Sequence, residues 1–154
     1  MNRLHESLSR KLTLISAPPG FGKTTLISQW LDDLRFRILD IGLPSVPFNP
    51  KSKIADPGRH NPKFCWLSLD EYDNQLERFL QYLVAAVQQV FPTACANFLQ
   101  LLDAPQLPPL PDLAAILLND LAALGEACIL VLEDYHLITE APIHQLLTRL
   151  LEHL

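Results

Sequence analysis

The hydrophobic pattern of this chain switches repeatedly between short apolar runs and longer stretches with helical spacing. Near-continuous apolar runs are typical of strands buried on both faces, whereas apolar residues that recur every three or four positions predict amphipathic helices. We expect strands at Leu12–Ser16, Phe64–Leu69 and Cys128–Leu132, and helices at Thr24–Leu34, Leu76–Val90, Leu113–Leu124 and Ile143–Leu154. Strands that alternate with helices favour right-handed crossovers and a mostly parallel sheet, so the pattern predicts an α/β fold.

One segment, 36–63, departs from this pattern. It carries prolines at positions 44, 47, 50, 57 and 62, and the tripeptide Asn-Pro-Lys occurs in it twice. Proline removes a backbone donor and fixes φ, so this density excludes a helix or a central strand. We therefore interpret 36–63 as a flexible, proline-rich surface insertion in a single domain that spans 1–154, with a functional lid as the alternative.

Several polar residues suggest where the helices begin. Asp112 is the expected N-cap of the helix at 113–124. Asn74 is expected to cap the helix at 76–90, with Glu77 as the return partner of a capping box. Bordering a bound ligand is the alternative role for Asn74. The residues of the first helix that we expect to face the sheet are Leu26, Ile27 and Trp30.

The stretch that joins the first expected strand to the first expected helix has the pattern of a phosphate-binding loop. Gly20 and Gly22 let the backbone turn tightly and approach an anion, and the helix directs the positive end of its dipole to the same place. Lys23 supplies a positive charge for β- and γ-phosphates, and Thr24 supplies a hydroxyl for Mg²⁺. The expected nucleotide-binding residues are Pro19, Gly20, Phe21, Gly22, Lys23, Thr24 and Thr25. Ala17 replaces the glycine of the strict pattern, and an ordinary Gly/Pro turn before a helix with a surface lysine is the alternative.

A second polar motif, Glu133-Asp134, follows the third expected strand. Ligands gather at the carboxyl ends of strands in open α/β sheets, so this acidic pair is expected to meet the phosphate-binding loop. Adjacent carboxylates suit a Mg-nucleotide site. Phosphate-loop ATPases commonly place aspartate first. Here glutamate comes first, and we assign Glu133, with Thr24, to the metal and Asp134 to catalysis, as the carboxylate that polarises water. A solvated acidic pair is the alternative, and His136 is either a γ-phosphate sensor or, more simply, a hydrogen-bonded structural residue.

The composition limits the class of protein. With 154 residues, 49% of them hydrophobic and 19% charged, the chain is globular. Its net charge of −5 and the lack of a basic run argue against contacts between this stretch and nucleic acid, and no apolar run reaches membrane-spanning length. Cys65, Cys95 and Cys128 lack metal-ligand spacing. We expect reduced, buried thiols at Cys65 and Cys128, which favours a cytoplasmic location.

Three segments together resemble the ATPase domain of the MalT-like transcriptional regulators, which belong to the STAND class of signal-transduction ATPases. The first, 11–30, contains the phosphate-binding (Walker A) loop and is generic. The other two are more particular: 66–79, which begins Trp-Leu-Ser-Leu-Asp-Glu-Tyr-Asp-Asn-Gln, and 130–138, which reads Leu-Val-Leu-Glu-Asp-Tyr-His-Leu-Ile and contains the Walker B position. The resemblance covers nearly the whole chain except 36–63, where the family passes almost directly from helix to strand.

The resemblance implies a P-loop NTPase three-layer sandwich with a mostly parallel sheet. It also implies that this sheet is incomplete at the C-terminus, because a later strand of the class lies between the first and third strands. The implied function is a cytoplasmic regulatory switch that binds Mg-ATP or ADP, is at most a slow ATPase, and self-associates through this domain. The family's sensor and DNA-binding domains lie beyond the matched part, and we expect the chain alone to be a truncated, marginally stable product.

Two other functions are compatible with the sequence. One is a freestanding P-loop phosphotransferase or ATPase, although the arginine-rich lid that a kinase needs is not found in the sequence. The other is an inactive truncated remnant that binds nothing. Affinity for ATP with and without Mg²⁺ separates the remnant from the two nucleotide-binding alternatives, and turnover with acceptor substrates separates the switch from the enzyme.

Overall fold

The computed structural model describes residues 13, 15, 20–40, 63–126 and 128–153, with the backbone alone for 34–40. Its helices are α2 (Lys23–Asp40), α3 (Leu76–Gln88), α4 (Ala96–Leu102), α5 (Leu110–Ala122) and α6 (Ala141–His153), and its strands are β1 (Lys63–Ser68) and β2 (Cys128–Glu133). Two short 3-10 helices, η2 (Glu71–Asp73) and η3 (Tyr135–Leu137), follow the strands. Among these described residues, no helix is both long enough and apolar enough to span a membrane.

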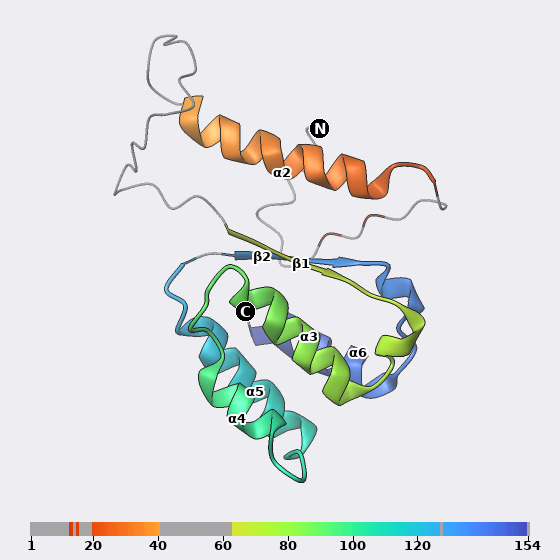
Figure 1. Cartoon of the computed structure of the whole chain (residues 1–154), viewed down its shortest axis with the longest axis vertical. Coiled ribbons are helices and arrows are strands. Elements are labelled where there is room, and N and C mark those ends of the chain that lie inside the picture. Colours follow the sequence, from red (N-terminus) through yellow and green to blue (C-terminus); the bar gives the residue numbers. More distant parts are fainter. Residues whose placement is uncertain (1–12, 14, 16–19, 41–62, 127, 154) are drawn as a thin grey trace.

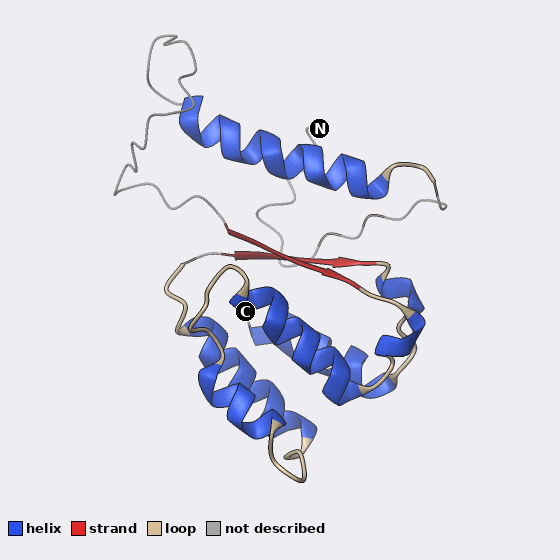
Figure 2. Ribbon diagram, viewed as in Figure 1, coloured by secondary structure: helices blue, strands red, loops and turns tan. Residues whose placement is uncertain are grey.

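The two strands form a parallel sheet in which Lys63 is opposite Cys128 and Ser68 is opposite Glu133. Their carboxyl ends therefore lie at the same edge. Helix α2 lies over one face of the sheet, and the remaining helices lie on the other side (Figures 1 and 2). The predicted α/β class is confirmed, with a parallel sheet of two strands in the described part of the chain. The strand expected at 12–16 falls outside the described residues except for positions 13 and 15, neither of which is in a strand.

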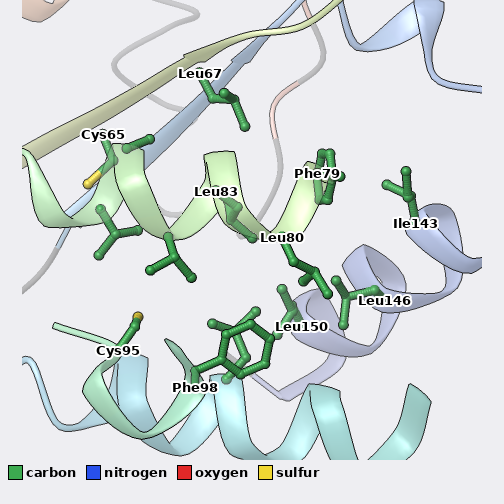
Figure 3. Close-up of a cluster of buried hydrophobic side chains, with 14 of the residues drawn as sticks. Cys65, Leu67, Phe79, Leu80, Leu83, Cys95, Phe98, Ile143, Leu146 and Leu150 are labelled. Atoms are coloured by element: carbon green, nitrogen blue, oxygen red, sulfur yellow. The ribbon is translucent and has the colours of Figure 1, made fainter. Parts of the chain in front are cut away.

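The larger hydrophobic core lies between the sheet and the four helices α3 to α6. Alternate residues of a strand share a face, and Cys65 and Leu67 of β1 point into this core (Figure 3). Helix α3 contributes the apolar stripe that its sequence predicts, since Phe79, Leu80, Leu83, Val84 and Val87 are all buried. Helices α4 and α6 complete the core with the fully buried side chains Phe98, Ile143 and Leu146.

A smaller cluster packs α2 against the other face of the sheet. Trp30 and Leu31 are buried there with Val131 of β2, and Ile27 packs against them. The predictions for Trp30 and Ile27 are confirmed, but the one for Leu26 is wrong, because that side chain is 39% exposed. Ile27, Trp30 and Leu31 follow the i, i+3, i+4 spacing of one helical face, whereas Leu26 lies about 100° around the helix from Ile27.

The boundaries of the proline-rich segment differ from the prediction at both ends. Helix α2 continues to Asp40, because residues 36–40 contain neither proline nor glycine to end it. Strand β1 begins at Lys63, the last residue of the predicted insertion. The interpretation as an insertion is thereby reduced to 41–62, and these positions lie outside the described residues.

Helix α5 begins three residues earlier than predicted. Its first carbonyl acceptor is that of Pro109, which receives the N–H of Leu113 at 3.1 Å, so Asp112 lies in the first turn and is not the N-cap. Pro111 fits the first turn because the N–H that it lacks would have no acceptor within the helix. The proline-rich residues before position 113 thus form the first turn of the helix.

Helix α4 was not predicted, and a distant residue stabilises its start. The carboxylate of Asp120 in α5 accepts the Phe98 N–H at 2.9 Å and the Asn97 side-chain amide at 2.9 Å. Asp120 is 8% exposed, and these two donors satisfy its buried oxygens. Because the cap comes from another helix, no local capping residue announces α4 in the sequence.

The three cysteines, far apart in the sequence, interact in the structure and are free thiols. Cys65 is buried as predicted, whereas Cys128 is only half-buried. A hydrogen bond between the two side chains lowers the pKa of Cys128 and raises that of Cys65. Burial raises the pKa of Cys95 to about 11. The more exposed sulfur is therefore the one that ionises first.

Candidate functional site

At the amino end of α2, the two glycines of the predicted phosphate-binding loop adopt backbone conformations that favour glycine. Gly20 and Gly22 have φ angles of +82° and +71°, a region that residues with a side chain rarely adopt. A Cβ added at either position would meet no atom of the described residues within 4 Å, so within that part of the chain glycine is required for its conformation and not for space. The Leu26 N–H donates to the Gly22 carbonyl at 2.8 Å, which makes Gly22 the first acceptor of the helix. The N–H groups of the first turn consequently have no acceptor within the helix and face the loop.

Glu133, the last residue of β2, meets this end of α2. The hydroxyl of Thr24 donates to Glu133 Oε1 and so joins the helix to the carboxyl end of the strand. The other carboxylate oxygen, Oε2, accepts the Ser68 hydroxyl at 2.9 Å and the Trp66 indole N–H at 3.1 Å. Ser68 is directly opposite Glu133 in the register, and Trp66 shares its face. Residues from three elements thus converge on a single carboxylate.

These partners hold Glu133 in its ionised form. The hydrogen bond from Thr24 lowers the pKa of Glu133 most, and the hydrogen bonds from Ser68 and Trp66 and the positive charge of Lys23 lower it further. Partial burial opposes them by raising the pKa, but the lowering effects are larger. A negative charge at the carboxyl end of β2 therefore faces the positive end of the α2 dipole and the cation of Lys23.

The acid dependence of stability tests this arrangement. Because the pKa of Glu133 is lower in the folded chain than its usual 4.5, its contribution to the free energy of unfolding is complete above pH 4.5 and is lost as the pH falls through the folded-state pKa. We expect Glu133→Gln to be less stable than the wild type at neutral pH and to lose less stability below pH 4.5. Urea unfolding across this range measures both effects, with the exposed Glu77→Gln as control. Parallel acid limbs for the wild type and Glu133→Gln would contradict the expectation.

Asp134, the predicted catalytic residue, has a different environment from its neighbour. It adopts a left-handed backbone conformation with φ of 55°, which aspartate tolerates better than most residues. Its side chain is exposed, and its Oδ1 lies 3.8 Å from Nδ1 of His136. Of the two carboxylates, Glu133 is the one that contacts α2.

The loops after β1 and β2 are held together by Asn74. Its side-chain amide donates to the Leu137 carbonyl at 2.8 Å, and its Oδ1 accepts the N–H groups of Thr139 at 2.6 Å and Glu140 at 3.2 Å. The prediction that Asn74 caps α3 is wrong, because the N-cap is Gln75 and has no side-chain cap bond. Its amide offers both donors and an acceptor, so it satisfies a second loop instead.

A capping box does occur in the same segment, one turn earlier than expected. The Asp70 carboxylate accepts the Tyr72 N–H at 2.7 Å, and the Asp73 carboxylate accepts the Asp70 N–H at 2.9 Å. Asp73 is 5% exposed. These two carboxylates therefore fix the loop after β1.

The predicted site residues are brought together in part. Thr24 and Glu133, both predicted to hold the metal, are in contact, and Lys23 lies close enough to lower the pKa of Glu133. Phe21 is 76% exposed and Thr25 is exposed as well. Pro19 lies outside the described residues.

Sequence reasoning missed Trp66 and Ser68 as partners of Glu133. A signal for them exists. They occupy alternate positions at the carboxyl end of β1, and in a parallel sheet that end lies beside the carboxyl end of the strand that carries the acidic pair.

The donor set at this edge fits a hard divalent cation that shares its coordination with phosphate oxygens. The Thr24 hydroxyl donates its hydrogen bond to Glu133, so the lone pairs of its oxygen are directed away from that carboxylate and can bind a cation. Glu133 offers a carboxylate oxygen. Mg²⁺ prefers such ligands and is commonly held by one or two protein groups together with the phosphates. Beside them, the first turn of α2 presents backbone N–H groups to an anion.

Comparison with known proteins relates this chain to a transcriptional regulator. No protein-family model matches the chain. Over 151 residues, which are 98% of the chain, it is 36% identical to the HTH-type transcriptional regulator MalT of Cronobacter sakazakii (strain ATCC BAA-894). The chain spans 14% of the length of that regulator. Nearly all of this chain is thus related to one part of a MalT regulator.

Proposed function

We propose that the chain is a regulatory switch domain that binds Mg-ATP and ADP and that belongs to a MalT-like transcriptional regulator. The observation that carries the proposal is the contact between Thr24, in the first turn of α2, and Glu133 at the carboxyl end of β2. The loop predicted to bind phosphate and the acidic end of β2 are 109 residues apart in sequence, and a contact between two such groups is what a Mg-nucleotide site requires. The similarity to a MalT regulator supports the regulatory part of the proposal.

Each group in the proposed site has a distinct task. The backbone N–H groups between Gly20 and Thr25 bind phosphate oxygens, and Lys23 neutralises charge on the outer phosphates. Thr24 and Glu133 hold Mg²⁺, which when bound neutralises the charge that the phosphates share. In this proposal the described elements are part of a P-loop NTPase sandwich whose sheet contains further strands beside β1 and β2.

Hydrolysis, in this proposal, is at most slow and resets the switch. Asp134 is the residue proposed to orient the attacking water. Its carboxylate is exposed and lies near His136, and of the acidic pair it is Glu133 that contacts α2, which favours slow turnover. We also propose a cytoplasmic location, self-association through this domain in the ATP-bound state, and no contact of this stretch with nucleic acid.

Binding of ATP with and without Mg²⁺ tests the proposal directly. We expect the wild-type chain to bind ATP more tightly in Mg²⁺ than in EDTA. Thr24→Ala should lose most of that difference, because it removes one metal ligand, and its Kd for ATP in Mg²⁺ should rise roughly tenfold. Ser28→Ala, on the exposed surface of the same helix, is the matched control and should behave as wild type. Isothermal titration calorimetry measures the dissociation constant of each of the three proteins in Mg²⁺ and in EDTA. A wild type whose ATP affinity is the same in Mg²⁺ and in EDTA would exclude the proposed site.

A further inference from the structure

We propose that Ser68 and Trp66 are positioning residues that anchor Glu133 through its Oε2 atom, so that Oε1 alone is presented to Thr24 and to the metal. The anchoring is a property of the free chain, and its benefit for metal binding rests on the proposed function. It also accounts for the unusual order of the acidic pair, since it gives a long, flexible glutamate the fixed position that a shorter aspartate would have by its length.

The first argument is geometric. Glu133 Oε2 accepts two donors, the Ser68 hydroxyl at 2.9 Å and the Trp66 indole N–H at 3.1 Å. The indole N–H also lies 3.2 Å from the Ser68 oxygen, so the three side chains form a closed triangle. Because Ser68 and Trp66 both donate to Oε2, Oε1 is left for Thr24. This assignment of the two oxygens follows from the hydrogen bonds alone and does not depend on which metal binds.

The second argument is the placement of the anchors. Ser68 and Trp66 come from β1, which pairs with β2 along its whole length, so their positions relative to Glu133 are set by backbone hydrogen bonds of the sheet. Trp66 is half-buried and packs in the cluster that holds α2, which restricts the indole ring. Donors that are themselves fixed restrict the carboxylate more than donors on a loop would.

The third argument concerns side-chain length. A free glutamate has three rotatable bonds, and ordering it costs more conformational entropy than ordering an aspartate. Two hydrogen bonds to the charged oxygen offset that cost. Aspartate at position 133 would be one carbon–carbon bond shorter and would be unable to reach both the β1 anchors and Thr24. Aspartate, the usual residue of such sites, is therefore expected to support weaker Mg²⁺-dependent ATP binding at position 133 than glutamate does.

Trp66 provides a readout that needs no nucleotide. The chain has two tryptophans, so in a Trp30→Phe background the emission comes from Trp66, whose N–H bonds the carboxylate. We expect this emission to change at acid pH as Glu133 is protonated, and the change to be absent in Glu133→Gln. In Ser68→Ala the transition should move to higher pH, because losing a donor to the ionised form raises the pKa of Glu133. Circular dichroism over the same range separates the transition from unfolding. A transition that persists in Glu133→Gln, or one that Ser68→Ala leaves in place, would overturn the anchoring.

Nucleotide affinity then tests the positioning of the free oxygen. We expect Ser68→Ala and Glu133→Asp each to weaken ATP binding about tenfold in Mg²⁺ and to leave binding in EDTA unchanged. The double variant should bind ATP in Mg²⁺ no more weakly than whichever single variant binds less tightly, because both changes break the same anchor. Ser68→Thr, which keeps the hydroxyl, should restore wild-type binding.

The two hypotheses fail in different ways. If the wild type shows no Mg²⁺-dependent binding, the proposed function fails, and the fluorescence titration alone then decides whether Glu133 is anchored. If binding depends on Mg²⁺ but Ser68→Ala matches the wild type, or if Glu133→Asp binds more tightly, the proposed function stands and the positioning role is overturned. Additive losses in the double variant would likewise contradict a shared anchor.

Discussion

Lys23→Ala is expected to weaken ATP binding by roughly 10- to 100-fold, the largest functional effect that we expect from any single substitution. A charged hydrogen bond to phosphate contributes about 1.5–3 kcal/mol, and each 1.4 kcal/mol is about tenfold in Kd. Lys23 stands in the first turn of α2, and its charge is near enough to Glu133 to lower the pKa of that carboxylate. Losing it removes the one side-chain cation that we assign to the phosphates.

Lys63→Ala is the matched control for this charge change. Lys63 lies at the opposite end of β1, where its ammonium group is 3.1 Å from Glu126 and 4.4 Å from the centre of the Phe91 ring. It carries the same charge but lies at the end of the strand away from the proposed site, so its removal should change the affinity for ATP by less than about twofold. Calorimetric titration of both variants at equal ionic strength checks the pair. Equal losses in both would show that ATP responds to the net charge of the chain and not to a site.

Phe98→Ala is expected to produce the largest loss of stability, about 3–5 kcal/mol. The side chain is fully buried in the core between α3, α4, α5 and α6, and its backbone N–H is the one that Asp120 caps. Truncation removes a large apolar surface and leaves a cavity in a closely packed core. For a chain of this length the melting temperature should fall by roughly 6–20 °C.

Phe21→Ala provides the same chemical change without the burial, since Phe21 is 76% exposed. It should alter the free energy of unfolding by less than about 0.5 kcal/mol. Urea unfolding followed by circular dichroism measures both variants, and Phe98→Leu serves as a milder step if Phe98→Ala does not fold. Similar losses for Phe21→Ala and Phe98→Ala would mean that the buried cluster is not the main source of stability.

The regular elements follow closely from local sequence. Helix α3 shows the predicted buried stripe, and the two described strands lie within one residue of their expected positions. Such features are predictable because a period of two or of 3.6 residues is fixed by backbone geometry, and burial of one face selects it. Errors arise where this local rule is weakest. Leu26 and Leu31 are both apolar, but only Leu31 lies on the inward face of α2, where it packs with Trp30 and Val131.

The residue types of the candidate site were predictable from the sequence, but the hydrogen bonds that β1 makes to Glu133 were not. Gly20, Gly22, Lys23 and Thr24 form a contiguous motif, so their task can be inferred from residue types and spacing alone. The partners of Glu133 cannot be inferred in this way, because Trp66 and Ser68 precede it by 67 and 65 residues. Which of the two adjacent carboxylates faces α2 is likewise set by the pleat of β2 and by its register with β1.

The same distinction applies to one capping residue that the prediction misassigned, Asn74, and to one that it missed, Asp120. Asn74 has the right type and position for an N-cap, yet its amide serves the loop after β2, because that loop lies beside it in the fold. Helix α4 has no cap nearby in sequence and receives one from Asp120, 22 residues away from Phe98. Residue types and their spacing thus account for the elements and the chemistry that this chain can offer. Its actual hydrogen-bond partners depend on packing, because every buried polar group must be satisfied by whatever the fold brings within reach.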